Sequence, residues 1–242
     1  MHNGFFITGT DTEIGKTEVT AALLSLYRKQ GFEVVGMKPV ASGCLEMPEG
    51  LRSEDALKIR AVSSVELPYA HTNPYAFAPA IAPHLAAAEV GARIESRVIL
   101  DARDRLSSPG RLVFVEGVGG WLVPLDGQWG VEDLARALDL PVVLVVGMRL
   151  GCLNHAMLSE RAILASGCAM AGWVANYFDG PFPRAEENLE TLRQHMKTPM
   201  LGVLPFVSGA DPDALSRHFD WSVLEQGRHR SGRDLQKRPS RR

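Results

Sequence analysis

The stretch that decides the fold of this chain is Gly9-Thr10-Asp11-Thr12-Glu13-Ile14-Gly15-Lys16-Thr17. It follows a short apolar run at residues 5–8 and opens a segment, residues 16–30, whose apolar side chains recur at helical spacing. A loop that ends in Gly-Lys-Thr between a strand and a helix is typical of phosphate binding, because backbone N–H groups and the helix N-terminus face the anion. Its first glycine comes one position earlier than in the common pattern. A glycine turn without a ligand is the alternative interpretation.

Apolar runs and helical patterns alternate along the rest of the chain. The runs do not alternate with polar residues, which indicates strands that are buried on both faces of a sheet. We therefore predict an α/β protein with a P-loop NTPase-like three-layer fold and a mostly parallel central sheet. Prolines interrupt residues 46–105, to which the pattern assigns no elements. The predicted strands are 5–8, 34–37, 112–115, 142–146, 173–175 and 202–204, and the predicted helices are 16–30, 131–138, 156–165 and 186–196.

Length and composition indicate a single globular domain. The chain has 242 residues, of which 45% are hydrophobic and 22% charged, and its net charge is -2. Such a chain can bury a core without disulfides or a structural metal. We assign residues 1–227 to one P-loop ATPase-like catalytic domain. Residues 228–242 carry seven Lys or Arg against one Asp, and we expect them to form a basic, disordered tail.

Several features bear on location and partners. The three cysteines are far apart and form no C-x-x-C pair, which favours a reducing compartment. The apolar runs are far shorter than the roughly 20 residues that cross a bilayer, and the amino terminus lacks the basic flank of a signal peptide. The basic tail lacks aromatic residues for base stacking. We expect a cytoplasmic protein with no membrane or nucleic-acid partner.

Charged residues stand where two of the predicted strands end. The carboxyl ends of parallel strands form one edge of a sheet, and ligands bind at that edge. Lys38 follows the strand at residues 34–37, and a lysine there, beside Lys16, would be unfavourable unless a polyanion lay between them. The alternative is a lysine whose ammonium group reaches solvent.

The acidic residues suggest a metal site. Glu116 is expected to end the strand at residues 112–115, where its carboxylate would join the Thr17 hydroxyl as a ligand of Mg²⁺. A carboxylate in a turn is the alternative for Glu116. The spacing of Asp55 does not distinguish a metal ligand from an acid in the first turn of a helix.

Taken in order, these motifs resemble the dethiobiotin synthetase family, from the loop at residue 9 to residue 207. The glycine turn is the weakest of these motifs by itself, but the ordered set is highly specific. The matching segments are the loop itself, Lys38-Pro39-Val40-Ala41-Ser42-Gly43, Ser53-Glu54-Asp55-Ala56, Asn73-Pro74-Tyr75, Pro83-His84, Val115-Glu116-Gly117, Leu150-Gly151-Cys152-Leu153-Asn154-His155-Ala156, Gly172-Trp173-Val174-Ala175-Asn176 and Gly202-Val203-Leu204-Pro205.

The resemblance implies a cyclo-ligase of biotin biosynthesis, which converts 7,8-diaminononanoate, CO2 and ATP to dethiobiotin, ADP and phosphate. One substrate amine captures CO2 as a carbamate. The carbamate then takes the γ-phosphoryl group as a mixed anhydride, and the other amine closes the ureido ring. Each step builds or moves negative charge, which the lysines would stabilise.

The resemblance also implies the site residues and a homodimer that binds the substrate carboxylate across its interface. The catalytic residues would be Lys16, Lys38 and Thr12, and the Mg²⁺ ligands Thr17, Asp55 and Glu116. Nucleotide contacts would come from Glu13, Ile14, Gly15, Lys16, Thr17, Glu18, Asp55, Glu116, Gly117, Val118, Gly119, Asn176, Tyr177, Pro205, Phe206 and Val207. Substrate contacts would come from Ser42, Gly151, Cys152, Leu153 and Asn154.

Two other functions compete with this one. An ATP-driven partition or positioning switch of the same P-loop superfamily usually has a second lysine early in the loop, where this chain has residues 10–13 without one. Only the basic tail favours the switch. A small-molecule kinase usually has a lid segment that is rich in arginine, and the sequence contains no such segment. The choice between ATP and CTP, and assembly beyond a dimer, stay open.

Overall fold

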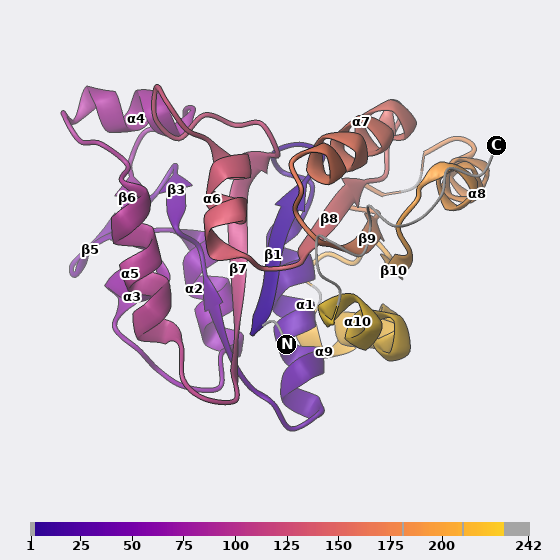
Figure 1. Ribbon diagram of the computed structural model, residues 1–242, viewed down its shortest axis with the longest axis horizontal. Helices are drawn as coiled ribbons and strands as arrows, with labels where there is room; N and C mark the ends of the chain where they lie inside the picture. The colour runs from indigo at the N-terminus through magenta and orange to yellow at the C-terminus, as the bar shows by residue number, and fades with distance from the viewer. Residues whose placement is uncertain (1–2, 181, 210, 230–242) are drawn as a thin grey trace.

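A six-stranded sheet forms the centre of the molecule (Figure 1). The computed structural model describes residues 3–180, 182–209 and 211–229. Neighbouring strands of this sheet are parallel, in the order β2-β7-β1-β8-β9-β10. Each predicted run lies in one of these strands, so the predicted α/β fold is confirmed. The strands are β1 (Gly4–Gly9), β2 (Glu33–Met37), β7 (Arg111–Gly120), β8 (Val142–Gly147), β9 (Met170–Asn176) and β10 (Met200–Leu204).

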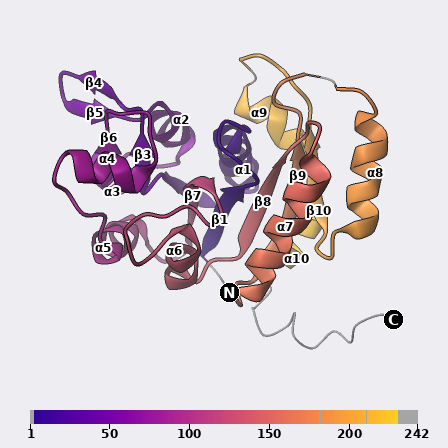
Figure 2. The same ribbon diagram turned by 90° about the horizontal axis from the view of Figure 1, so that it is seen from above.

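Apolar side chains cover both faces of the sheet. In β1, Phe6 packs into one core while Phe5 and Ile7 pack into the other, because successive side chains of a strand point to opposite faces. Figure 2 shows the helices as two outer layers with the sheet between them. The first core includes α5 (Ser96–Leu106), α6 (Val131–Leu138), α7 (Cys152–Ala165) and α8 (Ala185–His195), and the second includes α1 (Lys16–Lys29), α2 (Glu54–Val62), α9 (Pro212–Leu215) and α10 (Trp221–Arg228).

Residues 46–105, to which the sequence pattern assigned no elements, contain several short ones near the β2 edge of the sheet (Figure 1). Here β3 pairs with β6 in parallel, and β4 pairs with β5 in antiparallel fashion. Strands of three residues and helices of four are too short to produce a recognisable hydrophobic period. The longer helices α2 and α5, of nine and eleven residues, also lie in this region, and the sequence analysis missed them. The short elements in and beside this region are β3 (Val40–Ser42), β4 (Leu45–Met47), β5 (Gly50–Arg52), α3 (Tyr69–Thr72), β6 (Tyr75–Phe77) and α4 (Pro83–Glu89).

Helix α10 contains the first residue of the predicted basic tail. Arg228 is only 4% exposed, its Nη2 lies 2.8 Å from Glu225 Oε2, and its guanidinium lies 5.3 Å from the centre of the Phe32 ring. Arg228 therefore packs against the body of the protein. His229 is the C-cap of this helix, and residues 230–242 of the predicted tail lie outside the described residues.

The cysteines are free and buried. Burial raises the pKa of the Cys152 and Cys168 thiols, so both stay protonated and act as small apolar groups near neutral pH. Among the described residues, no helix combines the length and the apolar character required to cross a membrane.

Candidate active site

The loop between β1 and α1 is fixed by its own glycine and by the end of β9. Gly15 has a φ of +77°, in the left-handed region that favours glycine, and a Cβ at this position would collide with the side-chain amide of Asn176. The same amide donates a hydrogen bond to the Ile14 carbonyl oxygen at 2.7 Å. Glu13 also has a positive φ, +54°, which is uncommon for a residue with a side chain. The loop is therefore held in one conformation at the N-terminus of α1, and helix N-termini favour the binding of anions such as phosphate.

Lys16, the first residue of α1, is 7% exposed. Its Nζ donates a hydrogen bond to the Asp11 carbonyl oxygen at 2.7 Å. Burial, reinforced by the positive charge of Lys38, lowers the pKa of Lys16 to about 8. Because its hydrogen-bond acceptor is a neutral carbonyl, this ammonium would gain strongly from an anion entering the site.

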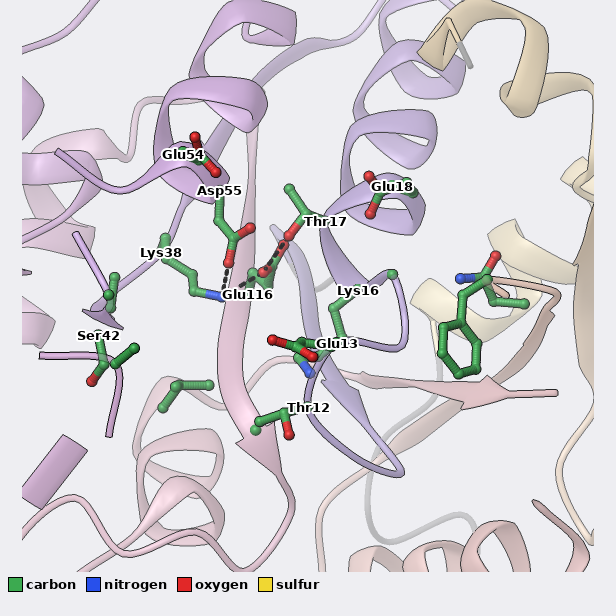
Figure 3. A pocket seen from close by; sticks show the side chains of 18 of the residues that line it. Thr12, Glu13, Lys16, Thr17, Glu18, Lys38, Ser42, Glu54, Asp55 and Glu116 are labelled. Carbon is green, nitrogen blue, oxygen red and sulfur yellow. Dashed lines mark hydrogen bonds and ion pairs between the residues drawn. The ribbon is translucent and has the colours of Figure 1, made fainter. Parts of the chain in front are cut away.

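Lys38 lies between two carboxylates that come from different elements (Figure 3). It follows β2, is 4% exposed, and its Nζ lies 2.6 Å from Glu116 Oε1 and 2.8 Å from Asp55 Oδ2. Asp55 stands in the first turn of α2, and Glu116 belongs to β7. Two buried lysines require nearby negative charge, which we expected from a bound polyanion, and these two carboxylates supply part of it.

This arrangement shifts the pKa values of its members. Burial by itself would lower the pKa of Lys38, but the charges of Glu116 and Asp55 outweigh burial and raise that pKa above its usual value. Burial by itself would raise the pKa of Asp55, but Lys38 outweighs it and lowers that pKa. The ammonium and the Asp55 carboxylate are therefore both charged near neutral pH.

The position of Glu116 corrects one expectation. Glu116 does not end its strand, since β7 continues to Gly120 and pairs with β1 as far as Gly9. The glycine at position 117 lets β7 lie close to the ring of Phe6 in β1, because a Cβ at this position would lie only 3.2 Å from that ring. Glu116 is therefore fully buried inside β7, where its Oε1 accepts a hydrogen bond from the Thr17 hydroxyl at 3.0 Å.

These groups face one open cavity of about 1010 Å³. The volume is at the upper end of the range for small-molecule sites, and it spans the carboxyl ends of the central strands. Most of the residues implied by the family resemblance line it. They are Thr12, Glu13, Gly15, Lys16, Thr17, Glu18, Lys38, Ser42, Asp55, Glu116, Val118, Gly119, Asn176, Tyr177, Pro205, Phe206 and Val207.

A few expected residues do not line this cavity. Ile14 is buried, and Gly117 packs against the ring of Phe6, so neither residue lines the cavity. Residues 151–154 form the N-terminus of α7, where Gly151 has a φ of +97° and precedes the first helical residue. The structure of one chain does not bring residues 151–154 to the cavity.

The cavity also includes residues that the sequence reasoning missed. Glu54 precedes Asp55, and residues 80–83 reach the cavity beside Ser42. The motif Pro83-His84 was the only signal for that second segment, and it specified no contact. The remaining missed residues are Ala41, Gly43, Val123, Phe178, Ser208, Gly209 and Leu215.

The donor set fits a magnesium ion. Glu116 Oε2 is buried without a hydrogen-bond partner, and such an orphaned carboxylate oxygen is unfavourable unless a ligand satisfies it. The Asp55 carboxylate and the Thr17 hydroxyl are the other hard oxygen donors beside it. Mg²⁺ prefers oxygen ligands and usually shares one or two carboxylates with substrate phosphates.

The glycine loop, the helix that follows it and the parallel sheet define the class of P-loop nucleotide-binding proteins. A family model described as an AAA domain matches residues 3–214. Among solved structures, the GDP complex of the signal recognition particle receptor FtsY from Elizabethkingia anophelis aligns with a TM-score of 0.50. That match has 12% identity and covers 95% of this chain and 65% of the other, so it supports the fold alone.

Curated relatives narrow the class to one family. The ATP-dependent dethiobiotin synthetase of Pseudomonas aeruginosa is 52% identical over 224 residues, which are 92% of this chain and 98% of the relative. The enzyme of the same name from Xanthomonas euvesicatoria is 50% identical over 214 residues, 88% of this chain and 96% of the relative. This chain belongs to the dethiobiotin synthetase family.

Proposed function

We propose that this protein closes the ureido ring of dethiobiotin in biotin biosynthesis, using 7,8-diaminononanoate, CO2 and ATP. The observation that carries the proposal is the pairing of a phosphate-loop lysine with a second buried lysine in one cavity. The relatives' name, ATP-dependent dethiobiotin synthetase, supports the same reaction. A partition or positioning switch is not favoured, because residues 10–13 of the loop lack the second lysine that such switches usually carry.

The reaction divides into steps that form and move negative charge. One amine of the substrate attacks CO2 and loses a proton, which gives a carbamate. A carbamate oxygen then attacks the γ-phosphorus of ATP, and the bond to the β-phosphate oxygen breaks. The second amine attacks the carbamate carbon, phosphate leaves with the transferred oxygen, and the ring closes.

Lys16 and Lys38 serve different parts of this sequence. Lys16, at the N-terminus of α1, stabilises the phosphates together with the backbone N–H groups of the loop. Lys38 lies deeper, between Asp55 and Glu116, and stabilises the carbamate and the transferred phosphoryl group. Thr12 and Ser42 line the cavity on the two sides of this pair. The Ser42 hydroxyl is buried without a hydrogen-bond partner, so it is available to a substrate.

We infer that Mg²⁺ is the cofactor and that Thr17, Asp55 and Glu116 hold it. When bound, the ion neutralises charge on the nucleotide phosphates. Lys38 holds the oxygens of both carboxylates in a defined position before nucleotide binds. Glu13, Gly15, Glu18, Val118 and Gly119 line the same cavity, and we infer that they lie beside the bound nucleotide.

The other end of the cavity suits a nucleobase. Asn176 ends β9 and Tyr177 follows it, and residues 205–207 follow β10. Phe206 and Val207 are more than half exposed, as expected for apolar side chains that a planar ring would cover. We infer that adenine binds between these segments.

We infer a homodimer in which residues 151–154 of one subunit complete the cavity of the other. Their position at the N-terminus of a fourteen-residue helix suits a carboxylate, because helix dipoles favour negative charge there. Leu150, beside them, is 89% exposed in the single chain, as a residue at a subunit contact would be. A cytoplasmic location and the lack of a nucleic-acid or membrane partner stay predictions from the sequence.

The test is phosphate release from ATP by the purified protein. Release should require diaminononanoate and bicarbonate together, and dethiobiotin should form in equal amount. Omitting either compound should reduce release to background. Hydrolysis that needs neither compound, but responds to DNA or lipid, would overturn the proposal in favour of the switch.

A further inference from the structure

The side chain of Tyr69 makes a hydrogen-bonded link between the two segments that position Lys38 and Asp55. Tyr69 is the first residue of α3, and its hydroxyl accepts a hydrogen bond from the Ser53 backbone N–H at 2.8 Å. The same hydroxyl donates to Asn73 Oδ1 at 3.0 Å. Both hydrogen-bonding functions of the phenol are therefore used, one toward each segment.

The first segment is the amino end of α2. Ser53 is the N-cap of this helix, and its hydroxyl accepts a hydrogen bond from the Ala56 N–H. Asp55 follows two residues later in the first turn. A shift of the Ser53 backbone would therefore carry the Asp55 carboxylate with it.

The second segment is the chain around Lys38. Asn73 is 4% exposed, and its Nδ2 donates to the Lys38 carbonyl oxygen at 2.7 Å. The Lys38 N–H donates to the Thr72 carbonyl oxygen at 2.8 Å. Residues 72 and 73 thus hold both backbone groups of Lys38.

The phenol ring is itself held in place. The Arg52 guanidinium lies 4.2 Å from the centre of the Tyr69 ring, within the range of a cation–π contact. Tyr69 does not line the cavity, so no ligand contact explains its hydrogen bonds.

We propose that Tyr69 is a positioning residue, whose hydroxyl couples the amino end of α2 to the chain at Lys38 and thereby sets the distance between the Lys38 ammonium and the Asp55 carboxylate. This inference deepens the proposed function and rests on it. In this proposal, α3 keeps the Lys38 ammonium and the Asp55 carboxylate at a fixed distance from each other.

The chain offers a matched control. The Tyr75 hydroxyl accepts a hydrogen bond from the Glu95 backbone N–H at 2.9 Å. Tyr75→Phe removes the same kind of hydrogen bond a few residues away, but it leaves the backbone contacts of Lys38 intact. Tyr69→Phe keeps the ring under Arg52 and removes only the hydroxyl.

The experiment compares these two variants with the wild type in turnover and in metal affinity. Tyr69→Phe loses the hydrogen bonds to the Ser53 N–H and to Asn73 Oδ1, so we expect kcat to fall about tenfold, while the KM for ATP changes less than about twofold. The affinity for Mn²⁺ in the presence of a non-hydrolysable ATP analogue, measured by electron paramagnetic resonance, should fall about three- to tenfold, less than for direct partners of a metal ligand. Tyr75→Phe should leave both values within about twofold of the wild type.

Amide hydrogen exchange in the wild type gives a second, variant-free measurement. Coupling between sites is reciprocal, so loading with Mn²⁺ and the ATP analogue should slow exchange at the Ser53 amide about threefold or more. The Glu95 amide should not change. Equal kcat and equal Mn²⁺ affinity for the two variants, or an unchanged Ser53 amide, would overturn the proposal.

These outcomes are separable from a failure of the proposed function. If the wild type shows no turnover with diaminononanoate and bicarbonate, the function fails. Metal affinity and amide exchange still decide the role of Tyr69 in that case.

Discussion

At the scale of single residues, the central feature is a buried ammonium between two carboxylates. Replacing Lys38 by Met leaves Glu116 buried without its counter-charge, and breaking a buried ion pair in this way costs about 3–5 kcal/mol of unfolding free energy. Because a divalent cation can take the place of the ammonium between the same oxygens, Mg²⁺ should restore part of this stability without nucleotide. Thermal unfolding with and without MgCl2 measures the effect.

Lys58→Met is the control for that measurement. Lys58 pairs with Glu18 at 2.5 Å, but both side chains are about two-fifths exposed, and exposed pairs contribute only about 0–1 kcal/mol. The unfolding free energy of Lys58→Met should therefore differ little from that of the wild type, and Mg²⁺ should not stabilise this variant more than it stabilises the wild type. If Lys38→Met also fails to respond to Mg²⁺ beyond the wild type, the carboxylates are not a cation site.

Lys16 predicts a pH dependence of nucleotide binding. Burial and the charge of Lys38 lower its pKa to about 8 in the free protein, and a bound polyphosphate would raise that pKa again. The bound state then holds more protons than the free state above pH 8, so affinity should fall as pH rises from 8, at up to about tenfold per pH unit. Calorimetry in buffers of different ionisation enthalpy should detect uptake of up to one proton.

Lys16→Arg tests the assignment of this proton, because a guanidinium stays charged throughout the range. This variant should bind nucleotide without proton uptake. Nucleotide affinity of the wild type that is constant from pH 7 to pH 9.5 would contradict the role given to burial at Lys16.

The sequence was enough to identify most of the residues of the candidate site, but not the contacts between them. Lys38 was detectable because a lysine that follows a buried strand is unusual. Its pairing with Asp55 was not detectable, because Asp55 comes from a helix in the region without a readable pattern. The hydroxyl of Tyr69 carries no sequence signal, since its partners are one backbone amide and one side chain fixed only by the fold.

At the scale of elements, the loop before α1 depends on a glycine for two separate reasons. Gly15 has a positive φ, and it also leaves room for Asn176 at the end of β9. Gly31, after α1, has a similar φ of +85° but no atom within 4 Å of an added Cβ. Substitutions at Gly15 and Gly31 can therefore distinguish the effect of backbone strain from the effect of a collision with the end of β9.

We expect Gly31→Ala to lower the unfolding free energy by about 1–2 kcal/mol through strain alone, with unchanged nucleotide affinity. Gly15→Ala should cost more and should weaken nucleotide binding more than about tenfold, because Asn176 must move and its hydrogen bond to Ile14 is lost. Chemical denaturation and equilibrium nucleotide binding measure the two effects. Equal behaviour of the two variants would show that the contact with β9 is unimportant.

The strands of the central sheet were predictable and the short elements were not, for a physical reason, although the eleven-residue helix α5 was also missed. Strands such as β8 are buried on both faces and therefore consist of uninterrupted apolar residues. The predicted boundaries differ from the structure mainly where β7 runs on through its glycines to Gly120. In residues 46–105 the short strands and helices depend on contacts distant in sequence, which no local pattern records.

At the scale of the whole molecule, the cavity of one chain lacks the proposed carboxylate site at residues 151–154. Two inactive variants test whether a second subunit supplies it. Lys38→Met removes charge from the reacting centre, and Asn154→Asp puts a negative charge where the substrate carboxylate is proposed to bind. Chains with different tags allow the mixed dimer to be purified.

The mixed dimer should recover about half of the wild-type turnover, because one of its two composite sites then carries both substitutions and the other carries none. If residues 38 and 154 instead act within the same subunit, both sites keep one defect each. The mixed dimer would then be as inactive as its parents, which would contradict a shared site.

The most direct measurement of the central claim follows an oxygen atom. If a carbamate is phosphorylated in this cavity, one oxygen of CO2 leaves with the phosphate. Turnover with ¹⁸O-labelled CO2, sampled before the label exchanges with water, should therefore give phosphate with one labelled oxygen for each dethiobiotin formed. Unlabelled phosphate at the normal rate would mean that the γ-phosphoryl group goes to water, and the account would be wrong.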